Sequence, residues 1–476
     1  MAELTTLSIA EAAKGLSRKE FSPVELTQAA LERIAALNPQ LNAFITVLED
    51  QARGAAKAAE REIMSGQRRG ALHGIPIALK DLCSTKGVRT TAGSKILQDH
   101  VPLHDATVAR RLAGAGTILL GKLHMNEFAY GPDGENEHYG RVRNPWNLER
   151  LTGGSSSGSG AAVAASLCLG ALGTDTGGSI RIPSALCGIA GLKPTYGRVS
   201  RHGITPLSWS LDHAGPMAKT VEDVALLLQA MAGFDAKDPG SAPYPVPDYT
   251  AALSGGMGGL RLGIPQEYFF EMLDPEVEGA VQQAIEVMRG LGATVHQVSW
   301  PSLRYATLAA LIIVLVEASA FHDTWIRTRP QDYQPDVALR LKWGLLVPAS
   351  AYVKAQRLRA LMCQEVAQLW PQVDVLVMPA TMMAAPQPGA TQVRMGNRQI
   401  STREALLRPM RPFNLTGLPA LSIPCGFTAT GLPIGLQIAG KPFEEATVLR
   451  VGHAYEQHTD WHRRQPPGAL AAELAC

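Results

Sequence analysis

The stretch that decides the fold of this chain runs from residue 152 to residue 172 and reads TGGSSSGSGAAVAASLCLGAL. Its Gly/Ser-rich start is followed by residues without a single charge, so a helix there would be apolar on every side and buried. Because a helix start carries free N–H groups and the positive end of the dipole, the Gly/Ser loop would then form a buried polar site. A flexible linker is the alternative for such a composition, and the buried helix argues against it.

Two familiar loop signatures fit this stretch only in part. GSSSG at residues 154–158 satisfies G-x-S-x-G with Ser156 at its centre, but the preceding NPWNLERLT is not the apolar strand that a nucleophile elbow requires. A P-loop ends in GK and then Ser or Thr, whereas Gly160 precedes two alanines, and G-x-G-x-x-G lacks its third glycine. We therefore expect neither an α/β-hydrolase nor a nucleotide-binding protein.

A second loop, GTDTGGS, spans residues 173–179 and ends at Ser179. Small residues before a serine allow consecutive backbone N–H groups to converge on one point, which is the geometry of an oxyanion hole. A plain turn is the alternative. An internal lysine, Lys80, ends the apolar run GIPIALK, and together with the two loops it favours a catalytic centre.

The composition describes a large folded protein. Of 476 residues, 46% are hydrophobic and 18% are charged, and 44 Lys and Arg against 42 Asp and Glu leave a net charge of +2. This charge balance argues against charge-driven binding of nucleic acid or of an anionic membrane. The most apolar run, residues 306–316, is well short of the roughly 20 residues that span a bilayer. We expect a buried helix or strand there, no membrane association and no direct contact with nucleic acid.

Cysteine and histidine spacing gives no metal-ligand pattern. The six cysteines include no C-x-x-C pair and the N-terminus has no apolar signal core, so we expect a reduced, cytoplasmic protein. His100 and His104, and the group His453, His458 and His462, lack close ligand spacing. We expect no metal site.

Short helices and strands alternate along the chain. Apolar runs at 75–79 and 117–120, separated by a helical segment at 106–113, predict parallel strands with a crossover helix. N-cap signals predict a helix from Ser22 to residue 37 and another from Thr220 to about residue 231. The other predicted elements are a helix at 48–64, mainly helical structure between about 265 and 370, strands at 373–377, 420–424 and 433–438, and a last helix at 446–457.

Three motifs resemble the amidase signature family, whose members hydrolyse amide bonds with a Ser, cis-Ser, Lys triad. They are HGIPIALKD, GGSSSGSGAAVAA and GTDTGGSIRIPSALCGIAGLKPTYGRVS, and the similarity extends through RNPW, LDHAGPM and NLTGLPALSIPCG to GLPIGLQIAGKPFEEATVLRVGHAYEQ near the C-terminus. Essentially the whole chain is covered. The resemblance implies an α/β amidase signature fold, with a large mixed β-sheet covered by helices on both faces.

The resemblance assigns the catalytic base to Lys80, the cis-serine to Ser155 and the nucleophile to Ser179. A lysine pKa of about 10.4 must fall by roughly 3 units before the amine can act as a base at neutral pH. Burial beside residues 75–79 would lower the pKa, and Asp81 would oppose that shift if its carboxylate pointed inward. Ser155 would then relay a proton between nucleophile and base.

Further backbone features follow from the same resemblance. The peptide bond between Gly154 and Ser155 is expected to be cis. Hydrolysis would proceed through an acyl-enzyme on the nucleophile, without a metal or organic cofactor. The oxyanion hole is implied at the backbone N–H groups of Thr176, Gly177, Gly178 and Ser179.

Within the family, the chain is most similar to the branch of glutamyl-tRNA amidotransferase A subunits, which release ammonia from glutamine beside a partner protein. That branch holds the charged ends of glutamine with an arginine in a KAQxxR segment and an acid shortly before NLAGLP. Arg359 in KAQRLR matches the arginine, but Leu407 stands about where the acid is expected. An ammonium group facing Leu407 and Arg408 would lose its counter-charge, which disfavours glutamine.

We therefore expect a stand-alone amidohydrolase, monomeric or homodimeric, that cleaves small apolar or aromatic amides and also esters, anilides or carbamates (urethanes). Residues 302–324 would add an apolar wall to its pocket. The candidate substrate-binding residues are Tyr130, Gly154, Ser156 and Arg359. The alternatives are the A subunit of an amidotransferase and a non-catalytic scaffold, and the intact triad disfavours the scaffold.

We expect a single domain over residues 1–476, because motifs near both ends belong to one family pattern. Its expected parts are an N-terminal helical segment at 1–65, a catalytic core at 66–235, a variable and mainly helical pocket region at 236–400, and a C-terminal return to the sheet at 401–476.

Overall fold

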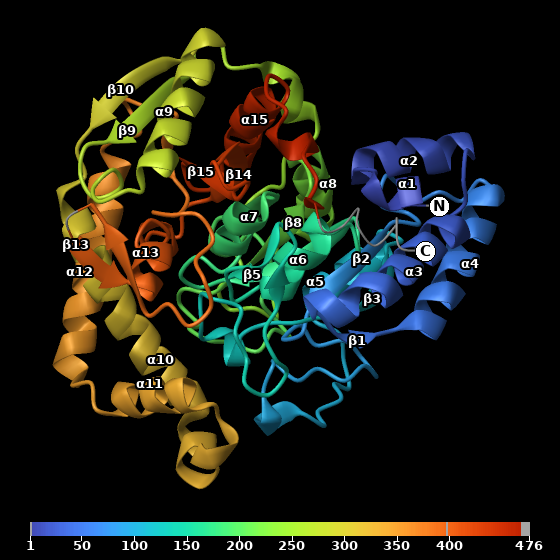
Figure 1. Cartoon of the computed structure of the whole chain (residues 1–476), viewed down its shortest axis with the longest axis horizontal. Helices are drawn as coiled ribbons and strands as arrows, with labels where there is room; N and C mark the ends of the chain where they lie inside the picture. The colour runs from blue at the N-terminus through green and yellow to red at the C-terminus, as the bar shows by residue number, and fades with distance from the viewer. Residues whose placement is uncertain (1, 397, 468–476) are drawn as a thin grey trace.

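The computed structural model describes residues 2–396 and 398–467, and an eleven-stranded mixed sheet forms its centre (Figure 1). The strands lie in the order β1-β3-β2-β6-β8-β7-β14-β15-β11-β9-β10. Their bounds are β1 Phe44–Val47, β2 Pro76–Lys80, β3 Ile118–Leu123, β6 Gly170–Asp175, β7 Ala190–Lys193, β8 His213–Ala218, β9 Arg261–Pro265, β10 Thr294–Val298, β11 Val375–Pro379, β14 Ala420–Phe427 and β15 Pro433–Gly440. Two separate two-stranded sheets pair β4 (Arg143–Asn144) with β5 (Asn147–Leu151) and β12 (Gln392–Met395) with β13 (Arg398–Ser401).

Strand directions change along the sheet. β2 runs parallel to both β3 and β6, as the alternation of apolar runs and helices predicts. From β6 through β8, β7, β14 and β15 to β11 every neighbour is antiparallel, and β9 and β10 continue in parallel beyond β11. The pairing of Leu192 with Leu421 joins the early and late parts of the chain in this one sheet.

Helices cover both faces of the sheet, and the expected α/β amidase signature fold is confirmed. The expected cap at Ser22 accepts a hydrogen bond from the backbone N–H of Glu25, and Thr220 accepts one from Asp223, each at 3.1 Å. The helices are α1 Ala2–Thr6, α2 Ile9–Arg18, α3 Pro23–Leu41, α4 Glu49–Met64, α5 Thr107–Gly114, α6 Ser157–Ala164, α7 Arg181–Cys187, α8 Val221–Met231, α9 Pro275–Gly290, α10 Ala306–Thr328, α11 Pro335–Leu345, α12 Ala349–Ala367, α13 Thr402–Leu407, α14 Arg411–Leu415 and α15 Glu445–Glu456.

The uncharged run after the first Gly/Ser loop is not one helix, so that part of the prediction is wrong. Helix α6 ends at Ala164, Ser166 takes a left-handed φ of 60°, and the chain re-enters the sheet as β6 at Gly170. A short apolar run in a sequence is compatible with both a buried helix and a buried strand. Here residues 170–175 form a strand because they pair with β2 on one side and with β8 on the other. The start of α6 is buried as expected, so the Gly/Ser loop does lie at a buried helix N-terminus.

The region expected to be mainly helical also contains strands. β9, α9 and β10 add a βαβ unit at one edge of the sheet, and α10 to α12 follow as consecutive helices (Figure 1). Within the described residues one helical segment, Pro301–Thr328, is long and apolar enough to cross a membrane, but 50% of its most apolar window is buried inside the protein. Helix α10 therefore behaves as a packed helix, and the expected boundaries at residues 65, 235 and 400 stay predictions.

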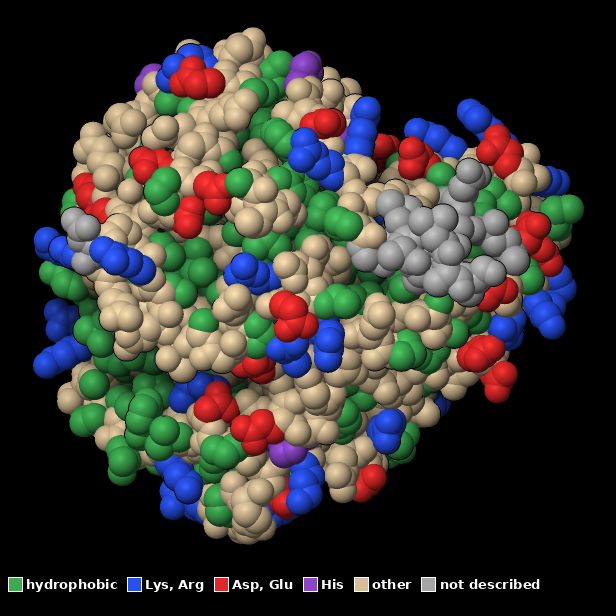
Figure 2. Space-filling view, viewed as in Figure 1, with side chains coloured by type: hydrophobic (Ala, Val, Ile, Leu, Met, Phe, Trp, Pro, Cys, Tyr) green, Lys and Arg blue, Asp and Glu red, His purple; other side chains and the backbone are tan. Residues whose placement is uncertain are grey.

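Positive and negative side chains are interspersed on the face that Figure 2 shows. The net charge of +2 is therefore not the sum of large opposite patches on that face.

Candidate active site

Lys80 is the last residue of β2 and is completely buried in the sheet. Its Nζ atom lies 2.8 Å from Ser155 Oγ, 3.0 Å from Ser156 Oγ and 2.9 Å from Thr174 Oγ1. Its hydrogen-bond partners among the described residues are thus three hydroxyl groups, and no carboxylate is among them. Burial lowers the pKa of Lys80 from 10.5 to about 7, while the charges of Asp175 and Asp212 act in the opposite direction. A neutral amine is therefore available near neutral pH.

Asp81, the neighbour that could have opposed this shift, belongs to a different cluster. Its Oδ2 accepts a hydrogen bond from the Thr91 backbone N–H at 2.9 Å, and its Oδ1 lies 3.9 Å from the Nζ of Lys122. Asp81 is not among the charges that act on Lys80. The adjacent pair of a lysine and an aspartate in the sequence is therefore not an ion pair in the fold.

The first Gly/Ser loop brings Ser155 to the lysine. The Gly154–Ser155 peptide bond is cis, and a Cβ atom on Gly154 would come within 2.1 Å of Asn126 Oδ1, so a side chain there would displace Asn126. Ser156 also contacts the lysine: its Oγ accepts a hydrogen bond from Lys80 Nζ and donates one to the Thr174 carbonyl at 3.1 Å. Its role in the structure is therefore to orient the base.

Ser179 lies beside this loop and lines a cavity. The backbone N–H of Ser156 donates to the carbonyl of Ser179 at 3.3 Å, so the two loops touch directly. Ser179 is 6% exposed and borders a small open cavity of about 50 Å³. The structure therefore brings Lys80, Ser155 and Ser179, which lie far apart in the sequence, into one buried centre beside this cavity.

The loop before Ser179 carries the backbone donors expected for an oxyanion hole, with one exception. The N–H of Gly178 donates to Asp175 Oδ1 at 2.8 Å and is not free for a substrate. The N–H groups of Thr176, Gly177 and Ser179 have no acceptor among the described residues. Three of the four expected donors thus remain available to a developing oxyanion.

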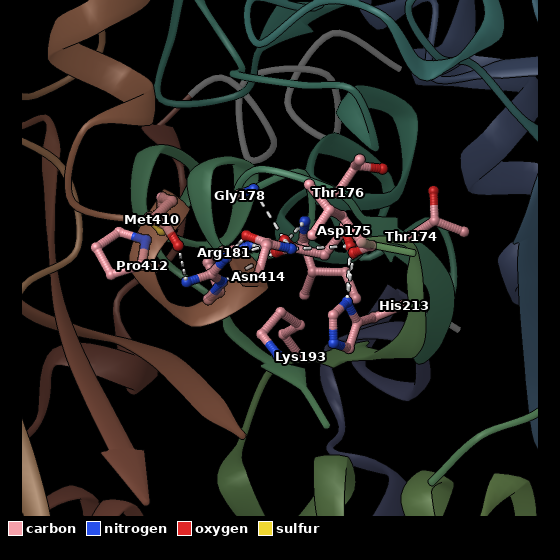
Figure 3. Close-up of polar contacts among 12 residues, drawn as sticks. Thr174, Asp175, Thr176, Gly178, Arg181, Lys193, His213, Met410, Pro412 and Asn414 are labelled. Carbon is pink, nitrogen blue, oxygen red and sulfur yellow. Dashed lines mark hydrogen bonds and ion pairs between the residues drawn. The ribbon is translucent and has the colours of Figure 1, made fainter. Parts of the chain in front are cut away.

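A buried network that the sequence motifs alone do not reveal holds this loop (Figure 3). Asp175 and Arg181 form an ion pair at 2.9 Å with both side chains fully buried, and Asn414 Nδ2 donates to Asp175 Oδ1 at 2.8 Å. Arg181 Nη1 also donates to the Met410 carbonyl at 3.1 Å and to Gln437 Oε1 at 2.6 Å. Burial alone would raise the pKa of Asp175, but the Arg181 guanidinium holds it well below its usual range. The sequence signal that could have revealed this network is that its polar side chains lie inside the motifs shared with the family.

The cavity wall combines apolar groups with two arginines. Tyr130 and Leu407 line it, together with Arg403 and Arg411, and no acidic side chain is among the described residues that line it. Arg359 is placed elsewhere: its Nε donates to the Leu415 carbonyl at 2.6 Å, and it does not line this cavity. Tyr130 is therefore at the site, whereas Arg359 bonds the backbone at the end of α14.

Metal-ligating side chains do not gather in the part of the chain that the structure describes. No group of three or more His, Cys, Asp or Glu residues is placed to hold a metal ion among residues 2–396 and 398–467.

Comparison with known proteins agrees with this geometry. The sequence matches the family model described as Amidase over residues 25–449. The chain belongs to the amidase signature family and is an amidase-type hydrolase of carbon–nitrogen bonds other than peptide bonds.

Particular relatives narrow the comparison. The A subunit of glutamyl-tRNA(Gln) amidotransferase from Roseiflexus sp. (strain RS-1) is 46% identical over 98% of this chain and 99% of its own length. Among solved structures, the A subunit of the same enzyme from Thermotoga maritima has a TM-score of 0.81 at 34% identity, covering 96% of this chain and 95% of that one. A chain from a vestigial protein complex that reveals the origins of an s-triazine catabolic enzyme has a TM-score of 0.92 at 37% identity, covering 95% and 98%.

These findings correct two expectations. The stand-alone amidohydrolase of apolar or aromatic substrates is contradicted, because full-length relatives at 43% to 46% identity carry the name of an amidotransferase subunit. The expected monomer or homodimer that acts alone on a small molecule is contradicted for the same reason. Residues 302–324 do contribute apolar side chains to the cavity through Ala310, Leu311 and Val314, but Arg403 and Arg411 line it as well, so the wall is not purely apolar.

Proposed function

We propose that this chain is the amide-hydrolysing subunit of a multi-subunit amidotransferase and that it releases ammonia from a small carboxamide such as glutamine. The observation that carries the proposal is the contact of 2.8 Å between Lys80 and Ser155, made by a lysine whose pKa is lowered to about 7. The names of the full-length relatives support the amidotransferase setting.

The reaction is proposed to start with attack of Ser179 Oγ on the amide carbonyl. A C–O bond forms while the hydroxyl proton passes to Ser155, whose own proton passes to neutral Lys80. The negative charge on the carbonyl oxygen is stabilised by the free N–H groups of Thr176, Gly177 and Ser179 itself. Lys80 then returns a proton through Ser155 to the nitrogen, the C–N bond breaks, and ammonia leaves.

Deacylation is proposed to repeat these steps with water. Water gives a proton through Ser155 to Lys80 as its oxygen attacks the Ser179 ester. The ester C–O bond breaks, the serine regains its proton, and the carboxylic acid product leaves as a carboxylate. One amide and one water thus yield one carboxylate and one ammonium ion at neutral pH.

The surface supports a subunit role. The three consecutive helices α10, α11 and α12 expose large apolar side chains, among them Trp343 at 53% and Val353 at 56% exposure. Large contiguous patches of exposed apolar side chains mark sites of protein association. The set comprises Leu308, Leu311, Phe321, Leu339, Trp343, Leu345, Val353 and Leu361. We propose that other amidotransferase subunits cover part of this set.

A cytoplasmic location is part of the proposal. Cys83, Cys168, Cys187, Cys363 and Cys425 are all free, which supports a reducing compartment.

The test is ammonia release from glutamine by the purified chain, alone and co-expressed with the other amidotransferase subunits of the same organism. Ser179→Ala and Ser155→Ala should each lower the rate by about 1,000-fold or more. Ser159→Ala is the matched control, because this buried serine of α6 donates to the Leu172 carbonyl and does not contact Lys80. A Ser179→Ala variant with unchanged turnover would refute the mechanism, and co-expressed subunits that neither bind nor stimulate the chain would refute the subunit role.

A further inference from the structure

The two arginines of the active-site cavity differ in their partners. Arg411 Nη1 donates to Glu404 Oε2 at 2.6 Å, and Glu404 Oε1 also accepts a hydrogen bond from Thr307, so the charge of Arg411 is balanced. Arg403 forms no hydrogen bond or ion pair with any described residue. Its guanidinium carbon lies 6.0 Å from the centre of the Tyr130 ring. Among the described residues, the cavity beside Ser179 therefore contains one cation without a counter-ion.

Tyr130 adds a second unused donor to the same wall. The residue is 3% exposed, and its Oη is buried without a hydrogen-bond partner among the described residues. A buried hydroxyl normally has a partner, since leaving one unsatisfied costs about 1 to 3 kcal/mol. Both Tyr130 and Arg403 line the cavity that Ser179 borders. A ligand acceptor in the cavity would therefore meet Arg403 first, since the Tyr130 hydroxyl oxygen has almost no accessible surface.

Nearby acids have other partners. Asp336 pairs with Arg340 at 2.6 Å, and Asp133 accepts hydrogen bonds from Asn126 and from the backbone N–H of Glu135. Burial lowers the pKa of Arg403 to about 10, with a further contribution from the charge of Arg340, so Arg403 still carries its charge at neutral pH. The acceptor that fits this wall is therefore an anion.

We infer that Arg403 forms a carboxylate subsite, so that the substrate is a carboxamide whose acyl chain ends in a carboxylate. A guanidinium binds a carboxylate through charge-assisted hydrogen bonds, which are stronger than neutral ones. This inference rests on the proposed amide hydrolysis and specifies its substrate class. Glutamine belongs to the class through its α-carboxylate.

The described part of the cavity wall offers no acidic side chain to an ammonium group. Leu407 lines the cavity, and no carboxylate does so among the described residues. An ammonium group would be desolvated there without a counter-charge. Glutaramate, which is glutamine without its amino group, should therefore be hydrolysed at least as efficiently as glutamine. Pentanamide, which replaces the carboxylate of glutaramate by a methyl group, should be a poor substrate.

The experiment compares kcat/KM for glutaramate, glutamine and pentanamide in the purified full-length chain. Arg403→Gln should lower kcat/KM for glutaramate by about 10- to 100-fold and leave pentanamide within about threefold, because only glutaramate loses a charge-assisted bond. Arg403→Lys, which keeps the charge, should retain part of the activity. Arg398→Gln is the matched control, since it removes one charge from an exposed side chain of β13.

Each outcome separates this inference from the proposed function. Equal losses for glutaramate and pentanamide in Arg403→Gln would overturn the carboxylate subsite, even where partner subunits stimulate glutamine hydrolysis. Arg403-dependent hydrolysis of glutaramate without partner-stimulated use of glutamine would uphold the subsite and refute the amidotransferase role.

A binding measurement covers the case in which no amide is turned over. The Ser179→Ala chain should bind glutarate, the reaction product, with an affinity that Arg403→Gln weakens about tenfold or more in calorimetry. Unchanged glutarate affinity, or no binding at all, would overturn the inference.

Discussion

Replacing Lys80 by Met should stabilise the folded protein at neutral pH while abolishing catalysis. Burial lowers the pKa of Lys80 from 10.5 to about 7, which means that the fold disfavours the charged amine. Methionine has a similar length and no charge to desolvate. The variant therefore removes a burial penalty that the wild-type protein carries because its base must be reactive.

The size and sign of the effect follow from proton linkage. Below about pH 7 the full shift of roughly 3.5 pKa units opposes folding, which corresponds to about 5 kcal/mol. The variant also loses the three hydrogen bonds that Nζ makes to Ser155, Ser156 and Thr174, worth about 1 kcal/mol each. At pH 7 the Lys80→Met chain should thus be more stable by about 2 kcal/mol.

The difference should change sign at alkaline pH. Between pH 7 and 10.5 the unfolded wild-type chain binds the extra proton, so wild-type stability rises with pH and the advantage of the variant shrinks. Above about pH 10.5 only the lost hydrogen bonds remain, and the variant should be less stable by about 3 kcal/mol, with a crossover near pH 8 to 9.

Urea unfolding followed by circular dichroism from about pH 6.5 to 10.5 measures this difference curve, and the change with pH cancels contributions common to both chains. Lys57→Met, at an exposed position of α4, is the control and should give a flat difference. A Lys80→Met chain that is less stable than wild type by the same amount at every pH would refute the reasoning, since Lys80 would then not be neutralised by the fold.

Three further predictions concern rate and loop geometry. The kcat/KM of amide hydrolysis should fall about tenfold per pH unit below about pH 7, because protonated Lys80 accepts no proton, and a flat profile down to pH 5 would contradict this. Asn414→Ala should destabilise the protein by about 2 kcal/mol and lower kcat, because Asp175 loses a buried hydrogen bond of 2.8 Å. An unchanged urea midpoint together with an unchanged rate would contradict this. Gly178→Ala should cost about 2 kcal/mol or more and impair catalysis, since φ is 132° and the new Cβ would lie 2.6 Å from Met410 Cγ; wild-type kcat would contradict this.

Local structure was predictable wherever the signal lies within a few residues. The caps at Ser22 and Thr220 are set by side chains that bond a backbone N–H three residues on, so sequence alone places those helix starts. The strand that ends in Lys80 was predictable because an apolar run between turn signals has few other structures available.

Long-range contacts were not predictable in the same way. Asp175 and Asn414 are 239 residues apart, and no local sequence pattern predicts that an amide from α14 will bond the carboxylate at the end of β6. The orientation of Asp81 toward Lys122 likewise depends on how β2 and β3 pair. The sequence did not single out Arg403 as a site residue. Its lack of a partner among the described residues depends on how the cavity is packed, and not on the residues next to it in the sequence.

Two buried cations of this core, Arg181 and Lys80, have different kinds of partner, and this difference explains their roles. Arg181 is paired with Asp175 at 2.9 Å and anchors the loop before Ser179 as a fixed charge. Lys80 donates to three hydroxyl groups, so burial lowers its pKa to about 7. A direct carboxylate partner would have kept Lys80 charged and useless as a base. Asp175 pairs with Arg181 and not with Lys80, so its charge raises the pKa of Lys80 less than burial lowers it.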